Sequence, residues 1–166
     1  MTPLRSTTEA IVRTLLSLFL TLSFAAAVAA KPAPDFSLKP NLQQSLIEVS
    51  QKGPVYLDFW ASWCGPCRRS FPFMNELVAQ YQPEGLTVIA VNLDVEKQDA
   101  DNFLTQFPAN FTIVYDPEFT IADAYKVAGM PSSYLIYKGE IIEQHVGFRE
   151  KDAEATHRTL KKLFGN

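Results

Sequence analysis

The chain has 166 residues, which suits one α/β domain with its own core and leaves little room for two. Apolar residues make up 47% and charged residues 20%, a composition typical of a folded protein and not of a disordered one. The formal net charge is −3 and like charges do not form long runs, so the sequence gives nucleic-acid binding no electrostatic support.

The first 30 residues have the features of an export signal. Two arginines lie in a polar start, an apolar stretch follows over 15–24, and small residues fill 25–30. This order predicts a secretory signal peptide, cleaved after Ala29 or Ala30. An uncleaved membrane anchor is the alternative, although 14–30 is shorter than the ~20 apolar residues that a span needs. Either way we expect a periplasmic or exported protein, in a compartment where disulfides persist.

The first half of the mature chain alternates polar and apolar segments. The Pro-containing stretch 31–35 is expected to be a linker that precedes a single domain over 36–166. Apolar residues at helical spacing predict a helix over 41–50. The apolar run 55–60 predicts a buried central strand, and a long helix is expected to follow over 64–81.

The second half continues the alternation and ends in a hairpin. Strands are predicted over 86–91, 111–115, 133–137 and 141–146, and helices over 99–107, 116–125 and 152–164. Asp116 and Asp152 are expected to be the N-caps of the last two helices, and Lys138-Gly139 to be the hairpin turn. This order predicts an α/β fold with a mixed, mostly parallel sheet between two layers of helices.

The strongest chemical signal is the pair Cys64 and Cys67, which follows a predicted strand and opens a predicted helix. In that context C-x-x-C is typical of a redox pair. The free N–H groups and the dipole at a helix N-terminus should stabilise the thiolate of Cys64. Because the thiolate is the attacking species in disulfide exchange, we expect Cys64 to attack and Cys67 to resolve the mixed disulfide.

Other uses of the two cysteines are weaker. A structural disulfide closing four residues would constrain the unfolded chain by only ~2 kcal/mol. A closed zinc site needs four ligands, and His145 and His157 have no ligand-like spacing. Cu(I) needs only two or three soft ligands, so a copper-carrying role stays open. Haem-attachment, flavin and nucleotide motifs are missing from the sequence, and we expect no cofactor and no resident metal.

Three segments carry a family resemblance. Residues 59–72, FWASWCGPCRRSFP, resemble the active-site segment of the thioredoxin superfamily, and most closely its exported TlpA-like and cytochrome c maturation branch. Residues 129–136, GMPSSYLI, are similar to the segment of that superfamily that contains a cis proline. The stretch 94–120 resembles the strand and helix that this branch inserts. The resemblance runs from about Asp35 to the C-terminus and implies a thioredoxin-like fold and thiol–disulfide oxidoreductase activity.

Asp58 is the one acidic residue in the predicted central strand. Burial among apolar neighbours should raise its pKa. The resemblance implies that Asp58 accepts the proton of Cys67. The alternative is an edge aspartate whose carboxylate reaches solvent.

The resemblance also implies how a substrate is received. Pro131 is expected to be cis and to face the cysteines, and the backbone of Met130 to pair with an incoming substrate strand. Trp63 should line the substrate groove. Gly65 and Pro66 form the central dipeptide that reducing members of the family carry.

The resemblance therefore implies a reductase of disulfides in exported proteins, with clients of the cytochrome c maturation or copper-site assembly type. A membrane thiol–disulfide electron donor would regenerate the dithiol. A disulfide-forming oxidant and a Cu(I) carrier are the alternatives. We expect a monomer with no nucleic-acid partner.

Overall fold

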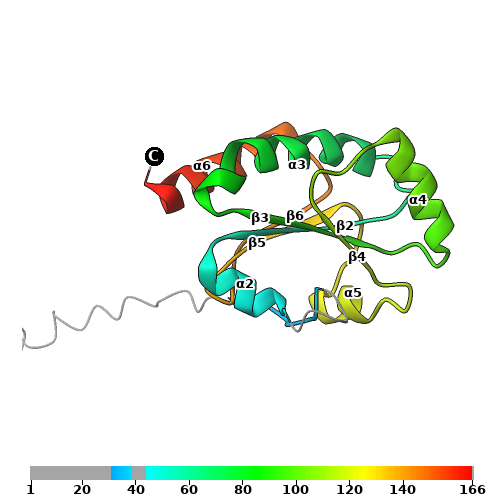
Figure 1. Cartoon of the computed structure of the whole chain (residues 1–166), viewed down its shortest axis with the longest axis horizontal. Helices are drawn as coiled ribbons and strands as arrows, with labels where there is room; N and C mark the ends of the chain where they lie inside the picture. Colours follow the sequence, from blue (N-terminus) through cyan, green and yellow to red (C-terminus); the bar gives the residue numbers. More distant parts are fainter. Residues whose placement is uncertain (1–30, 39–43, 166) are drawn as a thin grey trace, which may run out of the picture.

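A six-stranded mixed sheet runs through the part of the chain that the computed structural model describes, residues 31–38 and 44–165 (Figure 1). Its strands are Lys31–Pro32 (β1), Val55–Trp60 (β2), Thr87–Asn92 (β3), Thr112–Tyr115 (β4), Ser132–Tyr137 (β5) and Glu140–Val146 (β6). They lie in the order β1-β6-β5-β2-β3-β4. The predicted signal segment, 1–30, lies outside the described residues.

The sheet is mixed, as predicted, but its balance differs from the prediction. The pairs β2–β3 and β3–β4 are parallel, whereas β1–β6, β5–β6 and β2–β5 are antiparallel. Antiparallel pairings therefore outnumber parallel ones, and a mostly parallel sheet was the wrong expectation. The reason is that β5 of the C-terminal hairpin pairs antiparallel with β2, and β6 of the same hairpin pairs antiparallel with β1 at the outer edge.

Helices cover both faces of the sheet (Figure 1). They are Leu46–Lys52 (α2), Cys67–Tyr81 (α3), Lys97–Gln106 (α4), Thr120–Tyr125 (α5) and Glu150–Phe164 (α6), with a 3-10 turn at Gln82–Glu84 (η1). One apolar core contains side chains of α3, α4 and α6, and the other contains side chains of α2 and α5. None of the helices in the described part of the chain is long and apolar enough to span a bilayer.

Alternation along β2 divides its side chains between the two cores. Tyr56 and Trp60 belong to the core under α3, and Leu57 and Phe59 to the core over α2 and α5. Because strand side chains point alternately to the two faces, Asp58 lies on the α3 side. The acidic side chain of the central strand thus lies on the side of the sheet that is covered by α3, the helix that begins at Cys67.

Local signals explain where several elements begin. A capping box opens α2: the Ser45 hydroxyl accepts from the Glu48 N–H (3.2 Å), and the Glu48 carboxylate accepts from the Ser45 N–H (3.0 Å). The predicted hairpin turn is confirmed at Lys138 and Gly139, which have φ of 52° and 80°. Two positive φ values fit the twist of a two-residue hairpin.

The stretch expected to be a linker takes part in the sheet. Lys31 and Pro32 pair with β6, and the Ala33 N–H donates to the Gly139 carbonyl (2.9 Å). An edge strand tolerates proline because one side of it makes no ladder hydrogen bonds. Composition alone therefore pointed to a linker where long-range pairing makes a strand.

Two predicted helix starts were wrong. Helix α5 begins at Thr120 and not at 116, but the Asp116 carboxylate still accepts from the N–H groups of Ile121 and Ala122 (both 2.9 Å). Helix α6 begins at Glu150, and Asp152 lies inside its first turn. In both cases the acid interacts with the helix N-terminus without being its N-cap.

A backbone contact behind α2 gives a stability prediction. A Cβ at Gly53 would collide with the carbonyl oxygen of Gly85, and backbone atoms cannot swing aside as a flexible side chain can. We expect Gly53→Ala to lower the free energy of unfolding by about 1–3 kcal/mol, measured by urea denaturation of the oxidised protein. Gly65→Ala is the matched control, because a Cβ there meets no atom within 4 Å. Equal losses in the two variants would contradict the prediction.

Candidate active site

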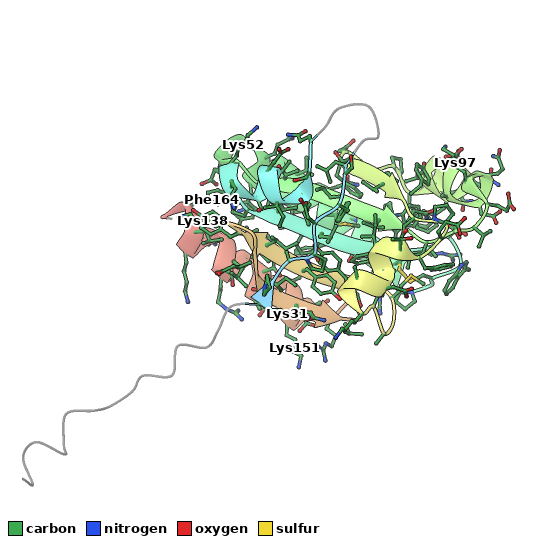
Figure 2. The ribbon with its side chains drawn as sticks, turned by 90° about the horizontal axis from the view of Figure 1, so that it is seen from below. Lys31, Lys52, Lys97, Lys138, Lys151 and Phe164 are labelled. Carbon is green, nitrogen blue, oxygen red and sulfur yellow. A yellow bond between two sulfur atoms is a disulfide. The ribbon has the colours of Figure 1, made fainter. Side chains whose placement is uncertain are left out.

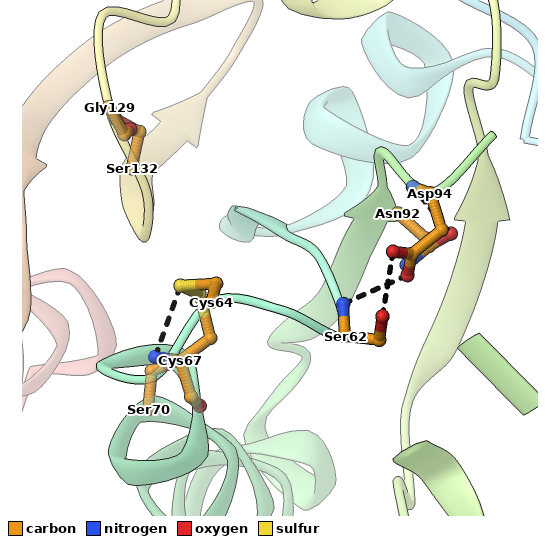
Figure 3. Close-up of a disulfide and its surroundings, with 8 residues drawn as sticks. All are labelled: Ser62, Cys64, Cys67, Ser70, Asn92, Asp94, Gly129 and Ser132. Atoms are coloured by element: carbon orange, nitrogen blue, oxygen red, sulfur yellow. Dashed lines mark hydrogen bonds between the residues drawn. A yellow bond between two sulfur atoms is a disulfide. The ribbon is translucent and has the colours of Figure 1, made fainter. Parts of the chain in front are cut away.

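The two cysteines lie where β2 leads into α3, and they are joined by a disulfide with Cα atoms 5.4 Å apart (Figure 3). The disulfide lies at the end of the molecule opposite Phe164, the last residue of α6 (Figure 2). Cys64 is 5% exposed and Cys67 is fully buried. Of the two cysteines, Cys64 is therefore the one with some exposed surface, as expected for the attacking residue.

The surroundings of Cys64 suit a thiolate. The predicted helix over 64–81 begins at Cys67, and Cys64, Gly65 and Pro66 form the turn before it. Cys64 therefore precedes the first helical turn and faces its N–H groups. The Cys67 N–H donates to the Sγ of Cys64 (3.3 Å). Donors at a helix N-terminus stabilise negative charge on that sulfur.

Asp58 is buried under α3, and in the described structure neither of its carboxyl oxygens has a hydrogen-bond partner. Burial raises the pKa of this carboxyl well above its usual range. The Ser70 hydroxyl, the one neighbour that would lower the pKa, donates instead to the Cys67 carbonyl (3.0 Å). The predicted burial and raised pKa are confirmed, and the alternative of a solvent-reaching carboxylate is wrong.

The Met130–Pro131 peptide bond is cis, as predicted. Ser132, the first residue of β5, pairs with Phe59 near the end of β2, so the cis bond lies at the disulfide edge of the sheet. Met130 packs against the core that contains both cysteines, and Figure 3 shows the segment from Gly129 to Ser132 beside Cys64. Within the described part of the chain, the backbone groups of Met130 have no hydrogen-bond partner.

The residues around the sulfur of Cys64 form an exposed surface. Trp63 is 70% exposed, and Gly65 and Pro66 are exposed as well. These positions were predicted to shape a substrate groove, and the structure brings them to the same surface. Their roles in substrate binding stay predictions.

Sequence reasoning missed Asp94, which is buried in the loop after β3. Its carboxylate accepts from the Ser62 N–H (2.9 Å), the Ser62 hydroxyl (2.8 Å) and the Asn92 side-chain amide (2.8 Å) (Figure 3). A signal for it was present. Asp94 closely follows the strand after β2, and the carboxyl ends of adjacent parallel strands lie at one edge of a sheet.

Metal ligands are sparse in this structure. The described residues contain no group of three or more His, Cys, Asp or Glu side chains placed to hold an ion. The soft donors at the site are the two sulfurs of the disulfide.

A sequence profile described as the AhpC/TSA family matches residues 29–145, more than half of the chain. The chain belongs to the AhpC/TSA family. It is 37% identical over 120 residues to the thiol-disulfide oxidoreductase ResA of Oceanobacillus iheyensis, a match that covers 69% of this chain and 62% of that protein. It is 36% identical over 136 residues to ResA of Bacillus thuringiensis, which covers 80% of this chain and 77% of that protein.

A solved structure agrees with these relatives. The crystal structure of a protein assigned as the thiol:disulfide interchange protein DsbE from Chlorobium tepidum superposes with a TM-score of 0.75 at 46% identity, covering 82% of this chain and 97% of that one. This member of the AhpC/TSA family therefore has a thioredoxin-like fold. It contains the Cys64–Cys67 disulfide and is a thiol–disulfide oxidoreductase.

The burial of Asp58 predicts how stability depends on pH. Because its pKa is raised in the folded state, the folded protein keeps this proton to higher pH than the unfolded chain does. The free energy of unfolding should therefore fall as pH rises from about 4 through the folded pKa, by at most about 1.4 kcal/mol per pH unit. Asp58→Asn has no proton to lose and should lack this slope.

The measurement is urea denaturation of both oxidised proteins at several pH values between 4 and 9. Other titrating groups are common to the two proteins, so the difference between the curves isolates Asp58. Parallel curves would contradict the prediction.

Proposed function

We propose that this chain is an exported reductase that passes two electrons from the Cys64–Cys67 dithiol to disulfides in other exported proteins. The observation that carries the proposal is the unequal pair of sulfurs. Cys64 can be reached from outside and faces helix N–H groups, whereas Cys67 is fully buried on the side of the sheet where Asp58 lies. Unequal sulfurs are what a two-step exchange needs.

In the first step the Cys64 thiolate attacks one sulfur of the client disulfide. A mixed disulfide forms between Cys64 and the client, and the client's second sulfur leaves as a thiolate. In the second step the Cys67 thiol gives its proton to the ionised carboxylate of Asp58, and the Cys67 thiolate attacks the Sγ of Cys64. The mixed disulfide breaks, the client leaves fully reduced, and the Cys64–Cys67 disulfide forms.

The cis-proline segment offers a place for the client backbone. The unpaired N–H and carbonyl of Met130 can pair with an extended client segment, as a strand adds to a sheet edge. Such pairing would hold the client's cysteine against Cys64 whatever the sequence around it.

The direction of transfer is supported by the central dipeptide. Gly65 and Pro66 match the reducing members of the resembled family, which argues against a disulfide-forming oxidant. A reductase is oxidised in each cycle, so a membrane thiol–disulfide donor would have to reduce it again. The predicted signal over 1–30 supports a periplasmic or exported location, and clients of the cytochrome c maturation or copper-site assembly type follow from the family branch.

The reduction potential tests the direction. We expect the Cys64–Cys67 couple to lie near or below about −230 mV, toward thioredoxin. The mature domain would be equilibrated in dithiothreitol or glutathione buffers, with the fluorescence of Trp60 and Trp63 as the readout. A value near about −120 mV, that of a strong oxidant, would contradict the proposal. Cys67→Ser, which cannot form the disulfide, is the control for the fluorescence change.

The proton acceptor has a test of its own. Asp58→Asn keeps the shape of the side chain but cannot take the proton of Cys67. We expect release of the mixed disulfide to slow by roughly 10²-fold, while attack by Cys64 changes little. Rapid mixing with a disulfide peptide followed by acid quenching would measure both steps by mass. Cys67→Ser, which traps the mixed disulfide, is the reference. Unchanged release would rule out this role for Asp58.

A further inference from the structure

Exposed apolar side chains gather at the disulfide edge of the sheet. In the described part of the chain the exposed large apolar residues are Trp63, Val95, Phe119, Ile142 and Val146. All except Ile142 lie where β2, β3, β4 or β6 ends, which is the edge that carries Cys64. Single exposed apolar residues are ordinary, but a set gathered beside a reactive group indicates a binding surface.

Val95 is the most exposed member of this set after Trp63, and the exchange chemistry does not explain it. It is 67% exposed, nearly as much as Trp63, and it belongs to the loop between β3 and α4. That loop contains neither a cysteine nor the cis proline. Exposed apolar side chains are therefore present on two separate loops at this edge, the one that contains Cys64 and the one that contains Val95.

The two loops are tied together by Asp94. Its carboxylate accepts both the N–H and the hydroxyl of Ser62, and the Leu93 N–H donates to the Trp60 carbonyl (2.9 Å). Asp94 is only 4% exposed, so water competes little for these bonds. Each partner of the Ser62–Asp94 contact directly precedes one of the two most exposed apolar side chains in the described structure, Trp63 and Val95.

We propose that Val95 is a specificity-determining residue for the client and that Asp94 is the positioning residue that holds Val95 in register with Trp63. The occupant is an apolar side chain next to the cysteine of a client's disulfide. Because Cys64 is only 5% exposed, a client sulfur must come down to the protein surface, and the residues beside it must contact the neighbouring loops. This inference rests on the proposed reductase function and names the sequence context of the client that it favours.

The test compares two disulfide-linked peptides that differ only beside the cysteine, one with leucine and one with serine. Reduced protein is mixed with each, and the ratio of their second-order rate constants is the readout. We expect the wild-type chain to favour the leucine peptide. Val95→Ser should lower that ratio up to about tenfold, the effect of losing one buried apolar contact. Ile142→Ser removes an equally β-branched, exposed side chain away from the disulfide edge and should leave the ratio as it is.

The positioning role of Asp94 has a separate readout. Asp94→Asn loses the charge that draws the two Ser62 donors, and we expect it to raise KM for the leucine peptide more than it lowers kcat. Ser62→Ala keeps the backbone N–H and should give a smaller change of the same kind, which preserves the test if Asp94→Asn does not fold.

An unchanged peptide ratio in Val95→Ser, or an equal change in Ile142→Ser, would overturn the inference while leaving the proposed function intact. A wild-type chain that reduces neither peptide would overturn both.

Discussion

A buried acid under α3, Asp58, is the constraint on which the rest of the site depends. Asp58 has no hydrogen-bond partner in the described structure, and an ionised carboxylate buried in that way is costly. On the same face of the sheet Trp60 packs against Phe71 and Phe103, with centroids 4.8 and 4.9 Å apart. Burial on this face raises the pKa of Asp58, beneath the helix that starts at Cys67.

Sheet topology explains why distant segments meet at this acid. The parallel strands β2 and β3 end at one edge, and the antiparallel strand β5 begins there. The cysteine loop, the loop that contains Asp94 and the cis-proline segment all lie at that edge. Asp94 is about 30 residues and Pro131 about 70 residues from Cys64 along the chain. Ladder hydrogen bonds fix the strands from which the three loops leave, and the Ser62–Asp94 contact joins two of those loops directly.

Strands and helices that depend on the local residue pattern could be predicted from the sequence, whereas elements and contacts that depend on residues far apart in the chain could not. Strand β2 and most of helix α3 follow from the pattern of adjacent residues, whereas the cis bond before Pro131 was expected from the family resemblance. Strand β1 exists only because β6 is beside it, and the contact of Ser62 with Asp94 spans 32 positions. The start of α5 was misplaced because Phe119 takes a positive φ of 58°, which an aromatic residue rarely does.

The two sulfurs owe their different chemistry to opposite surroundings. The Sγ of Cys64 accepts from the Cys67 N–H at the start of α3, which favours a thiolate there, whereas Cys67 is fully buried, which favours its thiol. In the proposed exchange the outer sulfur therefore attacks first. The inner sulfur becomes a nucleophile only by giving up its proton. When an ionised Asp58 takes that proton, it becomes a neutral carboxylic acid, the form that an apolar core favours.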